Sequence, residues 1–361
     1  MTDHSWIVNS RLHAHRLDGG QFDAPEAVVD HFVAVQAQDF LPALWALGLR
    51  TRDATESFVE QAINDRAIVR TWPMRGTIHF ITPADIRWVL ALSAPKALRD
   101  NARLRELGLD DEVFAQCRKV IASALADGRP QTRPAIYSAL EQAGISAAGQ
   151  RGYHILCRLS QEGLICIGPR EGKQHTVVLL DAWVPPGRSR SREEALAEFA
   201  LRYFTSHGPA TIKDYIWWSG LAAAEAHAGL EMVKPRLEQA KVGDDTYWFS
   251  AALLGSENVP SSAHLLPFLD EYLVAYKERD AQLPPEYNAL VDSGNVIFHQ
   301  PVIIDGRVAG IWTRKLKKGS VVVSIRLFRY LSESGKDALA AAVDRYGAFL
   351  GLQPELLDFV L

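Results

Sequence analysis

Hydrophobic positions along the chain follow a helical period in some segments and alternate in others, and the order of these patterns repeats. Residues 25–35 and 55–63 carry apolar side chains at helical spacing. The β-branched stretch at 67–82, interrupted by a Pro–Met–Arg–Gly turn, then predicts two strands joined in a hairpin. Helices followed by a hairpin are the element order of a winged helix-turn-helix, so residues 1–94 are expected to form one such unit.

The same order of elements returns twice more. It predicts a second winged helix-turn-helix unit over residues 95–186 and a third over 187–256. In the third unit the turn Ser219–Gly220 separates two short helices, as a helix-turn-helix requires. The expected elements are helices at 111–126, 134–142, 151–161, 192–206, 212–218 and 221–230, and strand pairs at 164–180 and 241–250.

The pattern changes to strict alternation after Pro260. Strands are predicted at 296–304, 308–312 and 320–327, with Asp-Gly and Lys-Gly turns between them. An amphipathic helix is predicted at 334–349. Residues 257–361 are therefore expected to form a small β-barrel with a terminal helix, and the whole chain is expected to be an α+β protein.

Composition places the chain among globular proteins: it has 361 residues, of which 48% are hydrophobic and 23% charged. Its three cysteines form no C-x-x-C pair, which favours free thiols in a reducing compartment. The first residues lack a signal-peptide pattern, and no apolar run approaches the ~20 residues that span a bilayer. We expect a soluble, cytoplasmic protein that does not bind membranes.

Charge is distributed unevenly. The net charge of −4 argues against binding nucleic acid through bulk charge. Residues 307–329 nonetheless hold seven basic side chains and no acidic one, and Arg188, Arg190 and Arg192 form a second basic cluster beside a Pro/Ser-rich linker. Such clusters suit a polyanion, although a solvated surface or a blunted strand edge would give the same composition.

The chemically unusual segment is VQAQDFLP at 35–42. In a continuous helix Gln36 and Gln38 would point about 200° apart, so they converge only if the helix ends there. Pro42 supports such an end, which predicts that both glutamines face a common cleft. The alternative is that Gln36 lies on a helix edge and Gln38 is a solvated cap. Asp39 is either a base that activates water or a helix cap, and the cap is favoured.

Five segments together resemble the winged-helix family that contains the AlkZ and YcaQ DNA glycosylases. They are VQAQ, LPALWALGLR, IVRTWPMRGTIHFITPADIRWVL, HLLPFLDEYLVAYKERD and VIIDGRVAGIWTRK, which occur in the family's order over essentially the whole chain. The resemblance implies three tandem winged-helix units and a C-terminal β-barrel in a C-shaped body. It also implies that the Gln-x-Gln motif, here Gln36 and Gln38, is catalytic, as in the AlkZ-like branch.

Glutamine chemistry narrows the substrate. A carboxamide is no base near neutral pH, but it accepts and donates hydrogen bonds and so positions water. That suffices where the leaving group is already activated, and an N7-alkylated guanine is positively charged and departs as a neutral base. The resemblance thus implies a glycosylase for N7-alkylguanine, including bulky adducts and interstrand crosslinks, in double-stranded DNA.

Further expectations concern mechanism and partners. No lysine precedes Lys96, which favours a monofunctional enzyme that leaves an abasic site over a lyase. The sequence lacks the common metal, phosphate-loop and serine-hydrolase motifs, so we expect no metal and no cofactor, and we expect a monomer. A buried pair between Asp270 and Arg279 is expected to join the barrel to the helical units. Contacts to DNA phosphates are predicted for Arg70, Arg75, Arg188, Arg190, Arg314, Lys315, Lys317 and Lys318.

Two other functions remain open. A non-enzymatic winged-helix regulator would need a recognition helix rich in Arg, Asn or Gln, and the helix at 221–230 (LAAAEAHAGL) has none of these. A protein–protein module is favoured only by the net charge.

Overall fold

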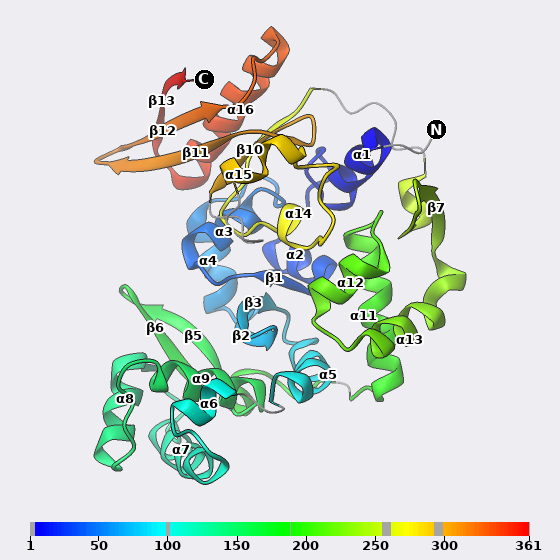
Figure 1. Cartoon of the computed structure of the whole chain (residues 1–361). Helices are drawn as coiled ribbons and strands as arrows, with labels where there is room; N and C mark the ends of the chain where they lie inside the picture. Colours follow the sequence, from blue (N-terminus) through cyan, green and yellow to red (C-terminus); the bar gives the residue numbers. More distant parts are fainter. Residues whose placement is uncertain (1–3, 99–101, 188, 255–260, 292–298, 361) are drawn as a thin grey trace.

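The computed structural model describes residues 4–98, 102–187, 189–254, 261–291 and 299–360. The chain falls into four sections: residues 4–98, 102–187, 189–254, and 261–291 with 299–360. Figure 1 shows the first section at the centre of the molecule, with the other three arranged around it. Helices and three sheets alternate through the described ranges, which makes the protein α+β.

The first section contains the predicted hairpin but a shorter helix before it. The alternating stretch at 67–82 forms β2 and β3, as predicted. The helix expected at 25–35 ends at Phe32, and the chain continues as a strand. The elements are α1 (His4–Ala14), α2 (Pro25–Phe32), β1 (Ala34–Gln36), α3 (Phe40–Gly48), α4 (Glu56–Asn64), β2 (Val69–Met74), β3 (Thr77–Ile81) and α5 (Ile86–Leu98).

The second section repeats helices and a hairpin, and its hairpin joins the first one. Strand β2 pairs with β5 at Arg70 and Ile167, so one six-stranded sheet has the order β1-β3-β2-β5-β6-β4. The elements are α6 (Ala102–Glu106), α7 (Asp111–Ala124), β4 (Gln131–Thr132), α8 (Arg133–Gln142), α9 (Arg151–Gln161), β5 (Ile165–Glu171), β6 (Gln174–Leu179) and α10 (Leu180–Trp183).

The third section contains the predicted pair of short helices and a two-stranded sheet. Gly220 ends α12 with a φ of 65°, a left-handed conformation that a side chain would disfavour. The elements are α11 (Arg192–Ser206), α12 (Ile212–Ser219), α13 (Ala223–Val233), the 3₁₀ turns η1 (Lys234–Arg236) and η2 (Ala251–Leu253), β7 (Glu238–Val242) and β8 (Asp245–Phe249).

The last section is an open sheet instead of the expected closed barrel. Its order is β13-β12-β11-β10-β9, with β13 and β9 at opposite edges, and α16 packs against both edge strands. The sequence analysis missed β13, which pairs parallel to β12 after α16. The elements are β9 (Ala263–Leu265), α14 (Glu271–Val274), η3 (Pro285–Tyr287), α15 (Asn288–Val291), β10 (Gln300–Ile304), β11 (Arg307–Lys317), β12 (Ser320–Leu327), α16 (Glu333–Leu350) and β13 (Gln353–Val360); residues 296–298 of the predicted first strand fall outside the described ranges.

One hydrophobic core joins the first section to the last. The indole N–H of Trp45 on α3 donates to the carbonyl of Leu265, and its ring lies 5.0 Å from that of Tyr346 on α16. A Cβ on Gly48 would lie 2.4 Å from the ring of Phe349, so α3 and α16 approach closely only because this residue is glycine. Searching the described helices for one long and apolar enough to cross a bilayer finds none.

Candidate active site

The helix before the two glutamines ends earlier than the sequence predicted. Val33 ends α2 with φ 69° and ψ −50°, a strained conformation for a β-branched residue. The chain then runs as β1, where Gln36 is paired with His79 of β3. Pro42 lies in the first turn of α3, where its missing N–H needs no partner, so it begins a helix instead of ending one.

The two glutamines have different surroundings. The side chain of Gln38 is exposed, and its Oε1 accepts the backbone N–H of Ile78 at 3.0 Å. Gln36 is 8% exposed, and its Oε1 accepts the backbone N–H of Ala37 at 3.2 Å. A cavity of about 520 Å³ includes Gln38 but not Gln36 in its lining. The structure therefore does not place both side chains in one cleft as the sequence analysis expected.

The cavity around Gln38 is rich in basic groups from the second section of the chain. Arg133 begins α8, and Arg170, Lys173 and His175 lie on the hairpin of β5 and β6. Burial, followed by the nearby arginines, lowers the pKa of His175 to about 4, so it is neutral at pH 7. The lining residues are Gln38, Asp39, Phe40, Leu41, Arg70, Ile78, Arg133, Tyr153, Arg170, Lys173 and His175, with Asp39 the sole carboxylate among them.

These basic groups differ in how far they are already paired. Arg170 makes a two-pronged ion pair with Glu60 of α4, with both contacts at 2.7 Å. Arg133 and Lys173 make no ion pair with any residue that the structure describes. The sequence analysis missed all three, because the hairpin and helix that carry them lie more than 90 residues beyond the glutamines.

Arg70 supports the backbone beside the glutamines. It is 3% exposed, and its Nε and Nη2 donate to the carbonyl of Ala37 at 3.0 and 2.7 Å. Its Nη2 also reaches the carbonyl of Gln38 at 3.3 Å, and burial lowers its pKa to about 9. The sequence analysis predicted a phosphate contact for Arg70, but most of its donors are used within the protein.

Asp39 lies at the N-cap position of α3 but makes no capping hydrogen bond with its side chain. The helix-cap role favoured from the sequence is therefore wrong. Its carboxylate is exposed and lines the cavity beside Gln38.

A buried acidic residue lies on the other side of Gln36. Glu271, at the start of α14, is 1% exposed, and its Oε1 accepts the backbone N–H of Gln36 at 2.7 Å. Its Oε2 accepts the indole N–H of Trp218 at 3.1 Å and lies 3.6 Å from Nε2 of His207. Burial alone would raise the pKa of Glu271, but His207, His79 and the Gln36 N–H together hold it below its usual value.

Burial lowers the pKa values of the histidines near Glu271. Burial, then Arg75, lowers the pKa of His79 to about 4, and burial also lowers the pKa of His207. The neighbouring acid Asp270 was predicted to pair with Arg279, but its carboxylate binds Arg50 through two contacts of 2.7 and 2.9 Å. An acidic pair within the apolar run HLLPFLDEYL was the sequence signal that could also have pointed to Glu271.

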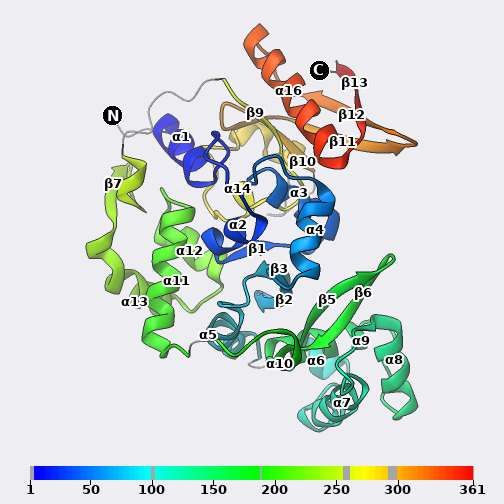
Figure 2. The ribbon, with the colours of Figure 1, turned by 180° about the vertical axis from the view of Figure 1, so that it is seen from behind.

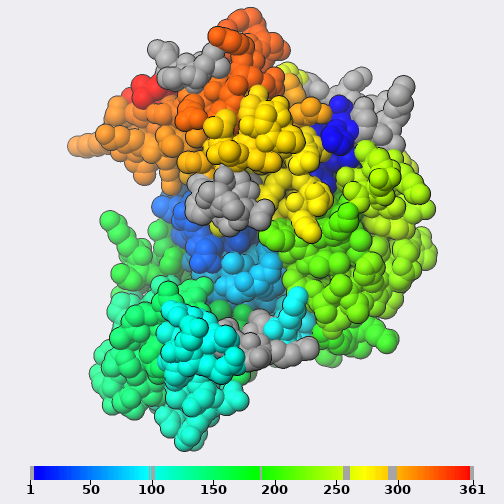
Figure 3. Space-filling view, in the orientation of Figure 1, coloured from blue at the N-terminus to red at the C-terminus, as the bar shows by residue number. Residues whose placement is uncertain are grey.

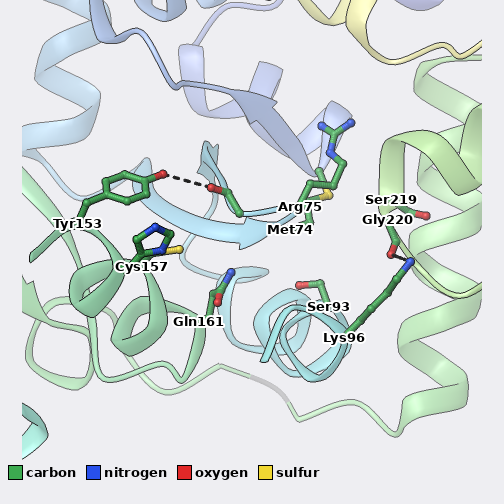
Figure 4. A pocket seen from close by; sticks show the side chains of 11 residues that line it. Met74, Arg75, Ser93, Lys96, Tyr153, Cys157, Gln161, Ser219 and Gly220 are labelled. Atoms are coloured by element: carbon green, nitrogen blue, oxygen red, sulfur yellow. Dashed lines mark hydrogen bonds between the residues drawn. The ribbon is translucent and has the colours of Figure 1, made fainter. Parts of the chain in front are cut away.

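Arg75 lies at a second cavity, of about 380 Å³, where the first three sections meet (Figure 4). The cavity lies between the β2–β3 turn, α5, α9 and the α12–α13 turn. Lys96 closes one side by donating to the carbonyl of Gly220 at 2.7 Å, and Tyr153 lines this cavity as well as the one around Gln38. The guanidinium of Arg75 points away from this cavity and reaches the carbonyl of Trp217 at 3.4 Å.

The described residues among the remaining predicted DNA contacts do not line the cavity around Gln38. Arg190 lies 3.8 Å from Glu198, and Arg188 is outside the described residues. On the hairpin of β11 and β12, Arg314 donates to the hydroxyl of Tyr346. Lys317 pairs with Glu355 of β13 at 2.8 Å, which contradicts the expectation that no acid lies near this cluster.

Lys315 and Lys318 are exposed and unpaired within the described ranges. Figure 3 shows a notch in the outline between the hairpin of β11 and β12 and the tip of the hairpin of β5 and β6, with the first section exposed between them. In the view from behind, the β5–β6 hairpin stands beside α4 (Figure 2), where Arg170 meets Glu60. Across the described ranges, no three His, Cys, Asp or Glu side chains gather closely enough to hold a metal ion.

Comparison with known proteins decides the family. A family model described as "DNA glycosylase AlkZ-like" matches residues 29–349. The chain belongs to the AlkZ-like DNA glycosylase family. It is 26% identical over 321 residues to an "Interstrand DNA cross-link repair glycosylase" of Streptomyces sahachiroi, a match that covers 79% of this chain and 81% of that protein. The solved structure of Streptomyces sahachiroi DNA glycosylase AlkZ superposes with a TM-score of 0.82 at 21% identity, over 99% of this chain and 100% of that one. The AlkZ fold thus extends over essentially the whole chain, as the resemblance in sequence implied.

Proposed function

We propose that this member of the AlkZ-like family is a monofunctional DNA glycosylase that hydrolyses the N-glycosidic bond of N7-alkylguanine in double-stranded DNA and leaves an abasic site. The observation that carries the proposal is the cavity that holds the carboxamide of Gln38 and the carboxylate of Asp39 together with two cations, Arg133 and Lys173, that have no ion pair within the described ranges. Arginine and lysine attract the phosphates of the DNA backbone, and the two polar groups are free to act on water and sugar.

The chemistry requires little from the protein because the lesion is already activated. The bond between C1′ and N9 breaks with its electron pair moving to the cationic base, which leaves as a neutral molecule, while the sugar gains oxocarbenium character. Water then bonds to C1′ and loses a proton. The carboxylate of Asp39 stabilises the developing positive charge and takes this proton.

The two glutamines fix the water in this proposal. Because the Ile78 N–H holds Oε1 of Gln38, the carboxamide plane is set and its Nε2 keeps two donors for the oxygen of the water. Gln36 does not line the cavity, and its Oε1 accepts the Ala37 N–H; its Nε2, which has no partner among the described residues, is proposed to reach the water or the sugar once DNA is bound.

The lyase question needs its own test, because Lys173 lines the cavity although it lies far from the glutamines in sequence. A lysine that attacked C1′ would form a Schiff base that borohydride reduces to a stable protein–DNA adduct. We expect no adduct with DNA that contains N7-methylguanine. An adduct that disappears in Lys173→Gln would show a bifunctional enzyme.

Binding to the duplex is proposed to use the repeated helix-and-hairpin arrays as winged-helix units, with boundaries at 1–94, 95–186 and 187–256, and residues 257–361 as a further module. The exposed Lys315 and Lys318 contact phosphates across the notch shown in Figure 3. The protein is proposed to act in the cytoplasm as a monomer, without metal or cofactor. Since its curated relative is named for crosslink repair, bulky adducts and interstrand crosslinks are proposed as substrates beside simple N7-alkylguanine.

The test uses a duplex oligonucleotide with one N7-methylguanine, followed by heating in alkali to break abasic sites. We expect breaks with the wild type and a loss of excision rate on the order of 100-fold in Gln36→Ala plus Gln38→Ala. Gln142→Ala on α8 removes an exposed glutamine remote in sequence from the motif and serves as the control. Absence of breaks in the wild type, or an equal rate in the double variant, would contradict the proposal.

A panel of N7-guanine lesions of increasing size, ending in a crosslink, defines the substrate range. Tight binding to the same duplexes without any excision would support the non-enzymatic alternative. The structure gives that alternative little support, since α13 carries no Arg, Asn or Gln to read base edges.

A further inference from the structure

We propose that Glu271 is a positioning residue for the reaction, because its carboxylate, from the last section of the chain, holds the backbone of Gln36 in place. No sequence motif links the two residues, which lie 235 positions apart. The inference rests on the proposed role of Gln36, and its test is designed to separate the two.

The position of β1 in the sheet explains why Gln36 needs such a partner. Strand β1 is an edge strand, paired only with β3, through three residue pairs that end at Gln36 and His79. The outward backbone groups of an edge strand have no neighbouring strand to bind. Gln36 is buried, so its outward N–H would otherwise be left unpaired away from water.

The carboxylate of Glu271 satisfies this N–H with a charge-assisted hydrogen bond of 2.7 Å. The other oxygen is bound by the indole of Trp218 from the third section and approached by His207. Both carboxylate oxygens of Glu271 are therefore held, and the group cannot rotate without losing a contact. Residues from the first, third and last sections meet at this one group.

The opposite side of the same short segment is held by Arg70, which binds the carbonyls of Ala37 and Gln38. An anion thus fixes the N–H of Gln36, and a cation fixes the two carbonyls that follow it. The segment between the two contacts carries both glutamines and leads directly into Asp39. A displacement near 1 Å of such groups lowers rates by about 100-fold.

Asp270 provides a matched control variant. It precedes Glu271 in sequence, is similarly buried, and binds Arg50 and the Tyr272 N–H that it caps, a cap that asparagine can also make. Asp270→Asn should weaken the fold without altering the contact at Gln36. Glu271→Gln keeps an amide oxygen for the Gln36 N–H, although its new NH₂ group faces the indole N–H of Trp218.

The experiment measures single-turnover excision of N7-methylguanine and the Kd for the same duplex in the full-length protein. We expect Glu271→Ala to lower the excision rate on the order of 100-fold with an unchanged Kd. In the Gln36→Ala background, Glu271→Ala should lower the excision rate less than about threefold, because the contribution that Glu271 makes through Gln36 is already lost. Glu271→Gln should stay within about tenfold of the wild type, since a neutral acceptor replaces a charged one.

Hydrogen–deuterium exchange of a peptide spanning residues 34–40 gives a readout that needs no enzymatic activity. Its protection should fall in Glu271→Ala and remain in Asp270→Asn. Equal rate losses in the two backgrounds, a loss in Asp270→Asn as large as in Glu271→Ala, or unchanged exchange in Glu271→Ala would overturn the inference. If the wild type excised nothing but exchange still changed as expected in Glu271→Ala, the proposed function alone would be contradicted. The inference that Glu271 holds the backbone of Gln36 would remain supported.

Discussion

The cavity around Gln38 and the buried centre around Glu271 lie on either side of one short segment, and they use charge in opposite ways. In the cavity, Arg133, Lys173 and Asp39 are left without ion pairs among the described residues. In the buried centre the carboxylate of Glu271 is bound by two N–H donors. One region is kept available for an outside molecule, and the other is kept rigid.

Under the proposed function, this difference is what lets weak catalytic groups act. In that function each carboxamide accepts one backbone N–H through its Oε1 and keeps its Nε2 donors for water. The rigidity of the segment comes from its backbone, which Arg70 and Glu271 bind, so that the two Nε2 groups stay available.

The largest effect is expected where a buried charge pair loses one partner. Arg50→Met removes the two contacts to Asp270 and leaves a buried carboxylate uncompensated. We expect the free energy of unfolding to fall by about 3–5 kcal/mol, measured by urea denaturation. Arg133→Gln, which alters a cation of the cavity instead, should change it by less than about 1 kcal/mol. Similar losses in both variants would remove the distinction between the two regions.

A middle-sized effect is expected from acidification. His79 is fully buried with a pKa near 4, whereas the unfolded chain titrates near 6.5, so the unfolded state binds protons first as the pH falls. Its contribution to stability is complete above pH 6.5 and is lost progressively toward pH 4. Between pH 7 and pH 5 the loss from this side chain should be about 2 kcal/mol.

The measurement compares urea unfolding at the two pH values in the wild type and in His79→Gln. The variant should lose about 2 kcal/mol less on acidification, because its side chain does not titrate. Gln142→Ala, which changes an exposed side chain that does not titrate, serves as the control for the effect of substitution itself. An unchanged dependence in His79→Gln would mean that the buried centre does not hold this ring neutral.

The smallest effect concerns the cavity and appears only in binding to DNA. Arg133→Gln together with Lys173→Gln should lower the slope of log K against log salt by about 1.8, or 0.9 for each lost phosphate contact. Lys317→Gln should change the slope by less, because Glu355 already partners this lysine. Titrations of undamaged duplex at several salt concentrations measure both. A larger change for Lys317 than for the cavity pair would show that the hairpin of β11 and β12, and not the cavity, supplies the main phosphate contacts.

Local patterns in the sequence predicted most of the regular elements. The hairpins at 67–82 and 164–180 and the helix pair around Gly220 follow from alternation, helical spacing and turn residues. The end of the helix before Gln36 could not be predicted, since Val33 adopts a left-handed conformation that its residue type disfavours. Tertiary contacts that hold β1 against β3 override that preference.

The same local patterns could not predict ion pairs between residues that lie far apart in the sequence. Asp270 was expected to pair with an arginine nine residues away, but Arg50, 220 residues away, lies against it in the fold. Lys317 was predicted to contact phosphate, but Glu355 already pairs with it. The pair could not be foreseen, because Glu355 lies on β13, a strand that was not predicted. Charged side chains pair with the opposite charges that lie near them in space, and the packing of the core sets those distances.

The sequence by itself determined the order of helices and hairpins, the Gln-x-Gln segment and the likeness to AlkZ-like glycosylases, because each depends on residues that are near in the chain. The tertiary structure alone decided that Gln38 lines a basic cavity, while the backbone N–H of Gln36 is bound by the carboxylate of Glu271. These properties arise where the other three sections fold against one edge strand of the first, and burial there makes every unpaired polar group costly.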